Sequence, residues 1–116
     1  MSEYPEKTCE IDRLVRQPKL VDAVLEGKKS QQRRDGVYGY PGETFELEGV
    51  EFRISALFRQ RLGDMSEQDA QAEGFPNLEV YQGLIARMHP GMSWDRERLV
   101  WVHQIKRVLG ANNERG

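Results

Sequence analysis

Apolar side chains recur at helical spacing in the first third of the chain. Pro18 suits the first turn of a helix, where its missing N–H costs no hydrogen bond, and Gly27 is a natural residue for a helix end. The apolar residues between them at helical spacing are Leu20, Val21, Val24 and Leu25. This pattern predicts a helix that begins at Pro18 and stops at Gly27.

From Thr44 the apolar period changes to two. Phe45 and Leu47 alternate with glutamates, and Glu48-Gly49 offers a turn before a second alternating run. The apolar members of that run are Val50, Phe52, Ile54, Ala56 and Phe58, and its polar face and end carry Arg53, Arg59 and Arg61. Such alternation predicts a β-hairpin with one buried face and one solvent-exposed face.

Two helices and a strand are predicted in the second half of the chain. Ser66 and Asp69 have the spacing of a capping box, so we expect a short helix that ends near Gly74. A helix from Asn77 is expected to end at Pro90-Gly91, with a stripe of Leu78, Tyr81, Leu84, Ile85 and Met88. The apolar segment 99–105 is predicted to return to the sheet as a strand, with Trp101 in the core.

The predicted order of elements is helix, strands, helix, helix, strand, which is typical of an α+β fold. With 116 residues, 38% hydrophobic and 31% charged, the composition is that of one globular domain. We expect this domain to cover residues 1–116, with a core from about 9 to 109 and loose ends. The sequence contains neither a membrane-spanning run nor a hydrophobic signal core, so the expected location is the cytoplasm, with no membrane partner.

Cysteine and histidine usage gives no sign of a metal centre. Cys9 is the single cysteine, which excludes an internal disulfide and a cysteine-based metal site. His89 and His103 lie in different predicted elements, without the carboxylate spacing that a shared metal site needs. We therefore expect no metal and no cofactor.

The segment 27–34 carries four positive charges and no negative one, in a chain whose net charge is −2. Its cations are Lys28, Lys29, Arg33 and Arg34, which can bind phosphate or carboxylate. A glycine-rich loop with Tyr38 and Tyr40 follows, and single-stranded nucleic acids need both cations and stacking rings. The alternative is a solvated surface turn, in which the two lysines merely complement a helix C-terminus. The net charge excludes a general DNA-coating protein and favours a small positive pocket.

Several short motifs together resemble the ASCH domain. The segment 27–34 is similar to the Gly-x-Lys-x-x-x-x-Arg signature of that family, and Gly42-Glu43 resembles the pair that opens its next strand. The run 62–75 resembles a strand-to-helix segment with an acidic residue before a Gly or Asn, and Val100-Trp101-Val102 fits the terminal strand. The resemblance spans roughly residues 20 to 108.

The resemblance implies a small PUA-like mixed β-barrel with helices flanking a basic cleft. The family is generally regarded as RNA-binding, so RNA or a nucleotide or nucleoside is the implied partner. One branch hydrolyses the acetyl amide of acetylcytidine with a Lys, a Thr and a Glu, and another is reported as ribonuclease. Lys29 and Glu73 match that Lys and Glu, whereas Gln32 stands at the Thr position.

Two functions follow from these residues. The first is an RNA- or nucleotide-binding module in which a basic cleft binds phosphate and an aromatic ring contacts the base. Its expected residues are Lys28, Lys29, Gln32, Arg33, Arg34, Tyr38 and Tyr40, and Trp94 is expected to border the cleft. The second is a hydrolase in which Lys29 and Glu73 form an acid–base pair and Ser30 or a water is the nucleophile. Gln cannot act as a nucleophile, which favours binding. A plain salt bridge between Lys29 and Glu73 is the structural alternative to catalysis.

Overall fold

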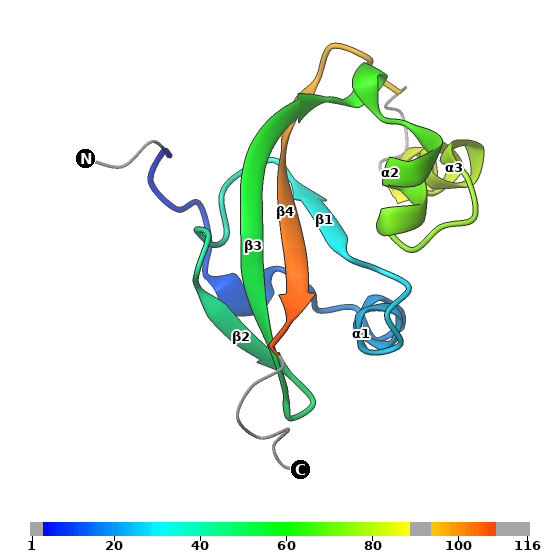
Figure 1. Cartoon of the computed structure of the whole chain (residues 1–116). Coiled ribbons are helices and arrows are strands. Elements are labelled where there is room, and N and C mark those ends of the chain that lie inside the picture. Colours follow the sequence, from blue (N-terminus) through cyan, green and yellow to red (C-terminus); the bar gives the residue numbers. More distant parts are fainter. Residues whose placement is uncertain (1–3, 89–93, 109–116) are drawn as a thin grey trace.

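The fold is a curled four-stranded antiparallel sheet with three α-helices beside it (Figure 1). The computed structural model describes residues 4–88 and 94–108. The strands are β1 (Gln31–Arg34), β2 (Thr44–Leu47), β3 (Val50–Arg61) and β4 (Leu99–Arg107), in the order β1-β4-β3-β2. The helices are α1 (Pro18–Leu25), α2 (Glu67–Ala72) and α3 (Leu78–Met88), with short 3-10 turns η1 (Ile11–Arg13) and η2 (Leu62–Asp64). The predicted α+β class is confirmed.

The two ends of α1 form where the sequence predicts them. Pro18 occupies the first helical position, and Gly27 adopts a positive φ of 81° just beyond the last turn. The helix buries Val21 and Val24. They belong to a core that also contains Leu14, Phe45, Leu47, Phe52, Ile54 and Ile105. This first core fixes α1 and the N-terminal segment to the β2–β3 end of the sheet.

The predicted hairpin joins β2 and β3, and its register breaks at one point. Glu48 (φ 51°) and Gly49 (φ 84°) both adopt the left-handed conformation of a tight hairpin turn. A β-bulge between Ile54 and Ala56 then shifts the register of β3 against β4. Because one extra residue exchanges the two faces of a strand, Leu57 is buried and Phe58 is 37% exposed. The expectation that Phe58 is buried is therefore wrong.

Both later helices begin at the predicted caps. Ser66 and Asp69 form a reciprocal capping box at the start of α2. The Asn77 side chain accepts a hydrogen bond from the Val80 N–H at 2.8 Å, which caps α3. The two helices and η2 bury a second core of Leu62, Met65, Ala70, Tyr81 and Val100. The predicted end of α3 at Pro90-Gly91 lies outside the described residues.

β4 is one of the two interior strands of the sheet, because it pairs with β3 on one side and with β1 on the other. Trp101 on this strand is only half-buried, with the Arg59 guanidinium 5.3 Å from its ring centroid. The prediction that Trp101 lies in the core is therefore wrong. Register places Trp101 opposite Arg59, beyond the end of the first core.

The basic segment contains a strand that the hydrophobic pattern did not predict. Residues 31–34 form β1, and the first three of them are buried. No alternation of apolar residues marks this strand, because its side chains are Gln, Gln, Arg and Arg. β1 forms the edge of the sheet, and it brings these polar side chains under the helices.

The described N-terminal residues contact the loop that follows β1. The Thr8 N–H donates a hydrogen bond to the Val37 carbonyl at 2.7 Å, and the Tyr40 hydroxyl donates one to the Pro5 carbonyl at 2.7 Å. Tyr4 stacks on Tyr40 with ring centroids 6.0 Å apart. In the described part of the chain, no helix has the length and apolar character needed to cross a membrane.

We predict that Glu48→Asn raises the free energy of unfolding by up to about 1 kcal/mol, because asparagine tolerates positive φ better than glutamate does. Urea unfolding of both proteins measures the change. Glu46→Asn is the matched control, since Glu46 is an exposed residue of β2 with extended backbone, where asparagine is unfavourable. A gain in both variants would show that loss of negative charge, rather than turn geometry, is responsible.

Candidate functional site

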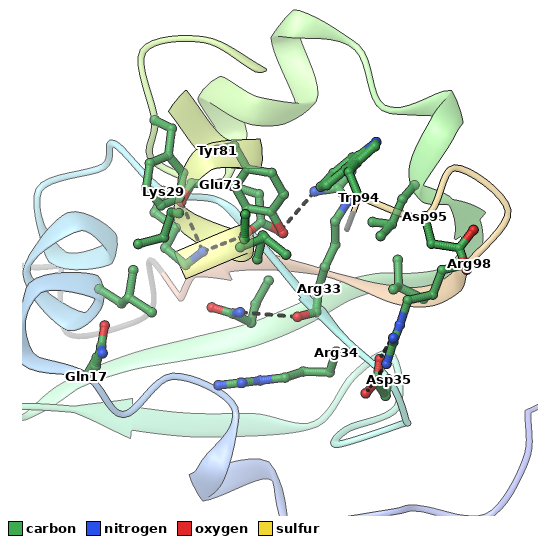
Figure 2. Close-up of a pocket in the computed structure, with 18 of the residues that line it drawn as sticks. Gln17, Lys29, Arg33, Arg34, Asp35, Glu73, Tyr81, Trp94, Asp95 and Arg98 are labelled. Carbon is green, nitrogen blue, oxygen red and sulfur yellow. Dashed lines mark hydrogen bonds and ion pairs between the residues drawn. The ribbon is translucent and has the colours of Figure 1, made fainter. Parts of the chain in front are cut away.

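A pocket of about 410 Å³ lies between β1, α1, the α2–α3 pair and the loop before β4 (Figure 2). It separates the two cores. One wall is polar and contains Lys29, Gln32, Arg33, Arg34 and Glu73. The opposite wall is apolar and is built from Phe75, Tyr81, Leu84, Ile85 and Trp94. A pocket of this size and mixed lining is suited to one small amphipathic ligand.

The Glu73 carboxylate holds the polar wall together. Oε1 accepts a hydrogen bond from Lys29 Nζ at 3.0 Å, and Oε2 accepts one from Arg33 Nη1 at 2.9 Å. The exposed fractions of the three side chains are 1–2%. Buried charges are tolerated only when they are paired and hydrogen-bonded, so each of the three requires the others.

Local backbone contacts bring Lys29 to Glu73. The Ser30 N–H donates a hydrogen bond to the Ala72 carbonyl at 2.7 Å, which joins the start of β1 to the end of α2. Gly74 follows with φ 101°, and a Cβ at this position would lie 3.4 Å from the Cβ of Lys29. Lys29 Nζ also donates to the Glu73 carbonyl at 3.1 Å. The helix end and the lysine therefore fit closely together.

Arg33 uses its guanidinium entirely for structure. Besides Glu73, it donates to the Gln31 side chain at 2.9 Å and twice to Gln60 Oε1, at 3.0 and 2.8 Å. Its Nη2 lies 3.5 Å from a carboxylate oxygen of Asp69. A guanidinium with this many partners has little capacity left for a phosphate. Arg33 therefore anchors β1 to β3 and α2.

Burial is the main influence on the charge state of Lys29. It lowers the pKa of the ammonium from the ordinary value of 10.5, while the Glu73 carboxylate opposes the shift. The nearby positive charges of Arg34 and Arg33 lower this pKa further. Lys29 releases a proton more readily than an exposed lysine does.

The His103 side chain contacts the backbone of β1 and of the loop that follows it. Its Nε2 accepts a hydrogen bond from the Tyr38 N–H at 3.0 Å, and its Nδ1 lies 3.2 Å from the Gln32 carbonyl. Since Nε2 must accept, the imidazole is neutral and Nδ1 carries the proton. Burial lowers the pKa of His103 below its ordinary value. The ring thus links β4 both to β1 and to the loop after β1.

Arg34 and Tyr38 form the second polar element of the pocket. The guanidinium carbon of Arg34 lies 5.3 Å from the Tyr38 ring centroid, and Nη2 donates to the Leu14 carbonyl at 2.6 Å. These contacts hold both side chains in place against the N-terminal segment. The Tyr38 ring also meets the His103 ring edge-on, with centroids 6.0 Å apart.

The apolar wall carries three aromatic rings in edge-to-face contact. Tyr81 packs against Phe75 with centroids 5.3 Å apart and against Trp94 with centroids 6.1 Å apart. Burial and the Glu73 charge raise the pKa of Tyr81 above its ordinary value, so its hydroxyl stays protonated. Figure 2 shows Tyr81 beside Glu73, where the two walls meet.

The structure separates the predicted site residues into two groups. Lys29, Gln32, Arg33, Arg34, Tyr38 and Glu73 line the pocket, and so does Trp94. Lys28, Ser30 and Tyr40 do not. Lys28 is exposed and pairs with Glu26 at 3.1 Å, and Ser30 is exposed, with its backbone bonded to Ala72 and Ile105.

Sequence reasoning did not predict the site roles of Arg16, Gln60, Tyr81 or His103. Arg16 is exposed at the pocket, and it makes no ion pair with any residue that the structure describes. Tyr81 was predicted only as part of an apolar helix stripe, and nothing local distinguishes it from Leu84 or Ile85. Across residues 4–88 and 94–108, no group of His, Cys, Asp or Glu side chains is placed to hold a metal ion; His89 lies outside these ranges.

The fold is that of an ASCH domain. The structure resembles an ASCH domain from Lactobacillus crispatus JV V101, with a TM-score of 0.57 and 16% sequence identity over 77% of this chain and 70% of that one. It also resembles a DUF984 protein from Enterococcus faecalis V583, with a TM-score of 0.59 and 16% identity over 78% and 67% of the two chains. No protein-family model and no curated protein matches the chain. The implied PUA-like fold is thus confirmed as a curled half-barrel, in which the described strand pairs are all antiparallel.

We predict that Lys29→Met lowers the free energy of unfolding by about 3 kcal/mol, because it removes one cation from a buried ion-pair network. Lys28→Met is the matched control. The Lys28–Glu26 pair is exposed, so its loss should change stability by less than about 0.5 kcal/mol. Urea unfolding measures both variants. Equal decreases in the free energy of unfolding of the two variants would contradict the structural role of Lys29.

Stability should also fall at mildly acidic pH because of His103. Its folded-state pKa lies below the value of about 6.5 that it has when unfolded. As the pH falls from 6.5 toward the folded pKa, the unfolded chain binds a proton that the folded protein does not, so the free energy of unfolding decreases.

The comparison that isolates this effect uses His103→Gln, which keeps an acceptor but cannot titrate. We expect the variant to be less stable at pH 8 and to lose less stability than the wild type between pH 7 and pH 5. Urea unfolding at each pH measures both proteins. If the free energy of unfolding falls equally in the two between pH 7 and pH 5, His103 is not the group responsible.

Proposed function

We propose that the protein binds a single nucleotide unit, free or within single-stranded RNA, in the pocket between β1 and the α2–α3 pair. The observation that carries this proposal is the pairing of cations with aromatic rings around a pocket of about 410 Å³. Its volume lies in the range of small-molecule sites. Nucleotide recognition needs both a positive charge for phosphate and rings for the base.

Arg16 is the cation best suited to a phosphate. It is exposed at the pocket and has no ion-pair partner among the described residues, whereas Lys29 and Arg33 are committed to Glu73. Arg34 adds a second positive charge beside the Tyr38 ring. This arrangement favours phosphate at the mouth and the base further inside.

The aromatic rings are placed for the base. Tyr38 lies on the polar side with Arg34, while Tyr81 and Trp94 lie on the apolar side. A planar heterocycle has a polar edge and an apolar face, so it matches the two walls of the pocket at once. The likeness in fold to an ASCH domain agrees with this proposal, since that family is regarded as RNA-binding.

A second candidate function is hydrolysis of a modified nucleoside or of RNA. The 3.0 Å contact between Lys29 Nζ and Glu73 favours it, because the two groups converge in the pocket as an acid–base pair must. Two observations weigh against it. Both Glu73 oxygens already accept hydrogen bonds from cations, and no serine or threonine lines the pocket in the described residues.

We predict that nucleoside 5′-monophosphates and short single-stranded RNA bind with a strong dependence on salt. Arg16→Ala should weaken binding of every nucleotide similarly and reduce the slope of log K against log salt by about 1, the value for one phosphate contact. Arg13→Ala is the matched control, since Arg13 is a nearby exposed arginine that does not line the pocket. Calorimetric titration at several salt concentrations measures both.

Two results would contradict the binding proposal. One is the absence of binding to any nucleotide or RNA, and the other is an unchanged salt slope in Arg16→Ala. Acylated nucleosides and RNA incubated with the wild type distinguish the second candidate. Release of acid or of shortened RNA would support hydrolysis, whereas intact ligand after binding supports recognition alone.

A further inference from the structure

Gln32 carries a buried acceptor that the protein leaves unused. The residue is only 7% exposed and lines the pocket, and its Oε1 has no hydrogen-bond partner among residues 4–88 and 94–108. A buried polar atom without a partner costs about 1–3 kcal/mol. Such an atom in the wall of a pocket therefore points to a group that arrives from outside.

The carbonyl and amide ends of this side chain are distinguished by a neighbour. Gln32 Nε2 donates to the Arg33 carbonyl at 3.3 Å. Exchanging the two ends would place Oε1 against that carbonyl, and two acceptors would then face each other. The unmet position is therefore an acceptor, which requires a donor from the ligand.

The backbone around Gln32 is held on several sides. His103 Nδ1 bonds to the Gln32 carbonyl, and the partners of Arg33 fix the next residue to β3 and α2. A recognition group held in this way loses little freedom when a ligand binds. The position is suited to selection among ligands as well as to affinity.

Arg34 supplies a complementary donor. Its Nε is also buried, without a hydrogen-bond partner in the part of the chain that the structure describes. Gln32 and Arg34 are two residues apart on β1, so their side chains leave the strand on the same face. Both residues line the pocket, and each holds one unused polar atom, an acceptor in Gln32 and a donor in Arg34.

We propose that Gln32 selects the base by accepting a hydrogen bond from an N–H on the base edge, while Arg34 Nε donates to an acceptor on the same ligand. This inference rests on the nucleotide-binding function proposed above and specifies its ligand class. The ligand is a nucleobase with a free amino or imino N–H, and bases in which alkylation removes that N–H are rejected. An unpaired Gln32 carbonyl beneath a bound base is the physical reason for rejection.

The test compares nucleotides that differ only in the N–H. The pairs are uridine and 3-methyluridine, cytidine and N4,N4-dimethylcytidine, and adenosine and N6,N6-dimethyladenosine, all as 5′-monophosphates. For the base that binds best, the wild type should bind the methylated form about 10- to 100-fold more weakly, as expected for loss of a specific base contact. In Gln32→Met, which has a similar shape but no acceptor, the two forms should bind equally.

One further variant completes the experiment. Gln104→Met is the matched control, because Gln104 lies on β4 outside the pocket, and it should discriminate like the wild type. Thermal unfolding shows whether each variant folds. The comparison of methylated and unmethylated nucleotides on the wild type tests the proposal even where Gln32→Met fails to fold.

The outcomes separate this inference from the function on which it rests. If the wild type binds both forms of every pair equally, or if folded Gln32→Met still discriminates, Gln32 does not select the base, although nucleotide binding stands. If the wild type binds no nucleotide, the proposed function fails and the inference fails with it.

Discussion

The structure depends on the burial of one carboxylate between two cations. Glu73 caps the end of α2, Lys29 lies two residues before β1, and Arg33 is the third residue of β1. Each of these buried charges is unfavourable without the others. Their mutual attraction therefore fixes where the edge strand meets the helices. The three residues line the pocket together with Leu20, which packs against the first core, and with Tyr81 and Val100 of the second core.

This constraint divides the basic residues by role. Charges near one another in the sequence have different tasks: Lys28 is solvated, Lys29 and Arg33 are structural, and Arg34 packs on an aromatic ring. Arg16, which lines the pocket and makes no ion pair with a described residue, comes from the segment before α1. A cluster of like charges in a sequence is thus a poor guide to which of them a ligand contacts.

Local signals explain the parts of the fold that the sequence predicted. Pro18, the Ser66–Asp69 capping box and the Glu48-Gly49 turn determine their elements through short-range contacts. β1 could not be predicted in this way, because its pattern is polar throughout and Arg33 is buried against partners 27 and 40 residues away. The Lys29–Glu73 contact was expected only from the family resemblance, and the role of Arg16 had no local signature.

The interior position of β4 affects the order in which the molecule can form. β4 is the last described strand, yet β1 pairs only with it, across about 70 residues of chain. Contacts of such long sequence separation form slowly, because a large loop must close first. During synthesis the β2–β3 hairpin can fold early, whereas β1 must wait for residues 99–107. The polar strand that lines the pocket is therefore among the last parts of the chain to become ordered.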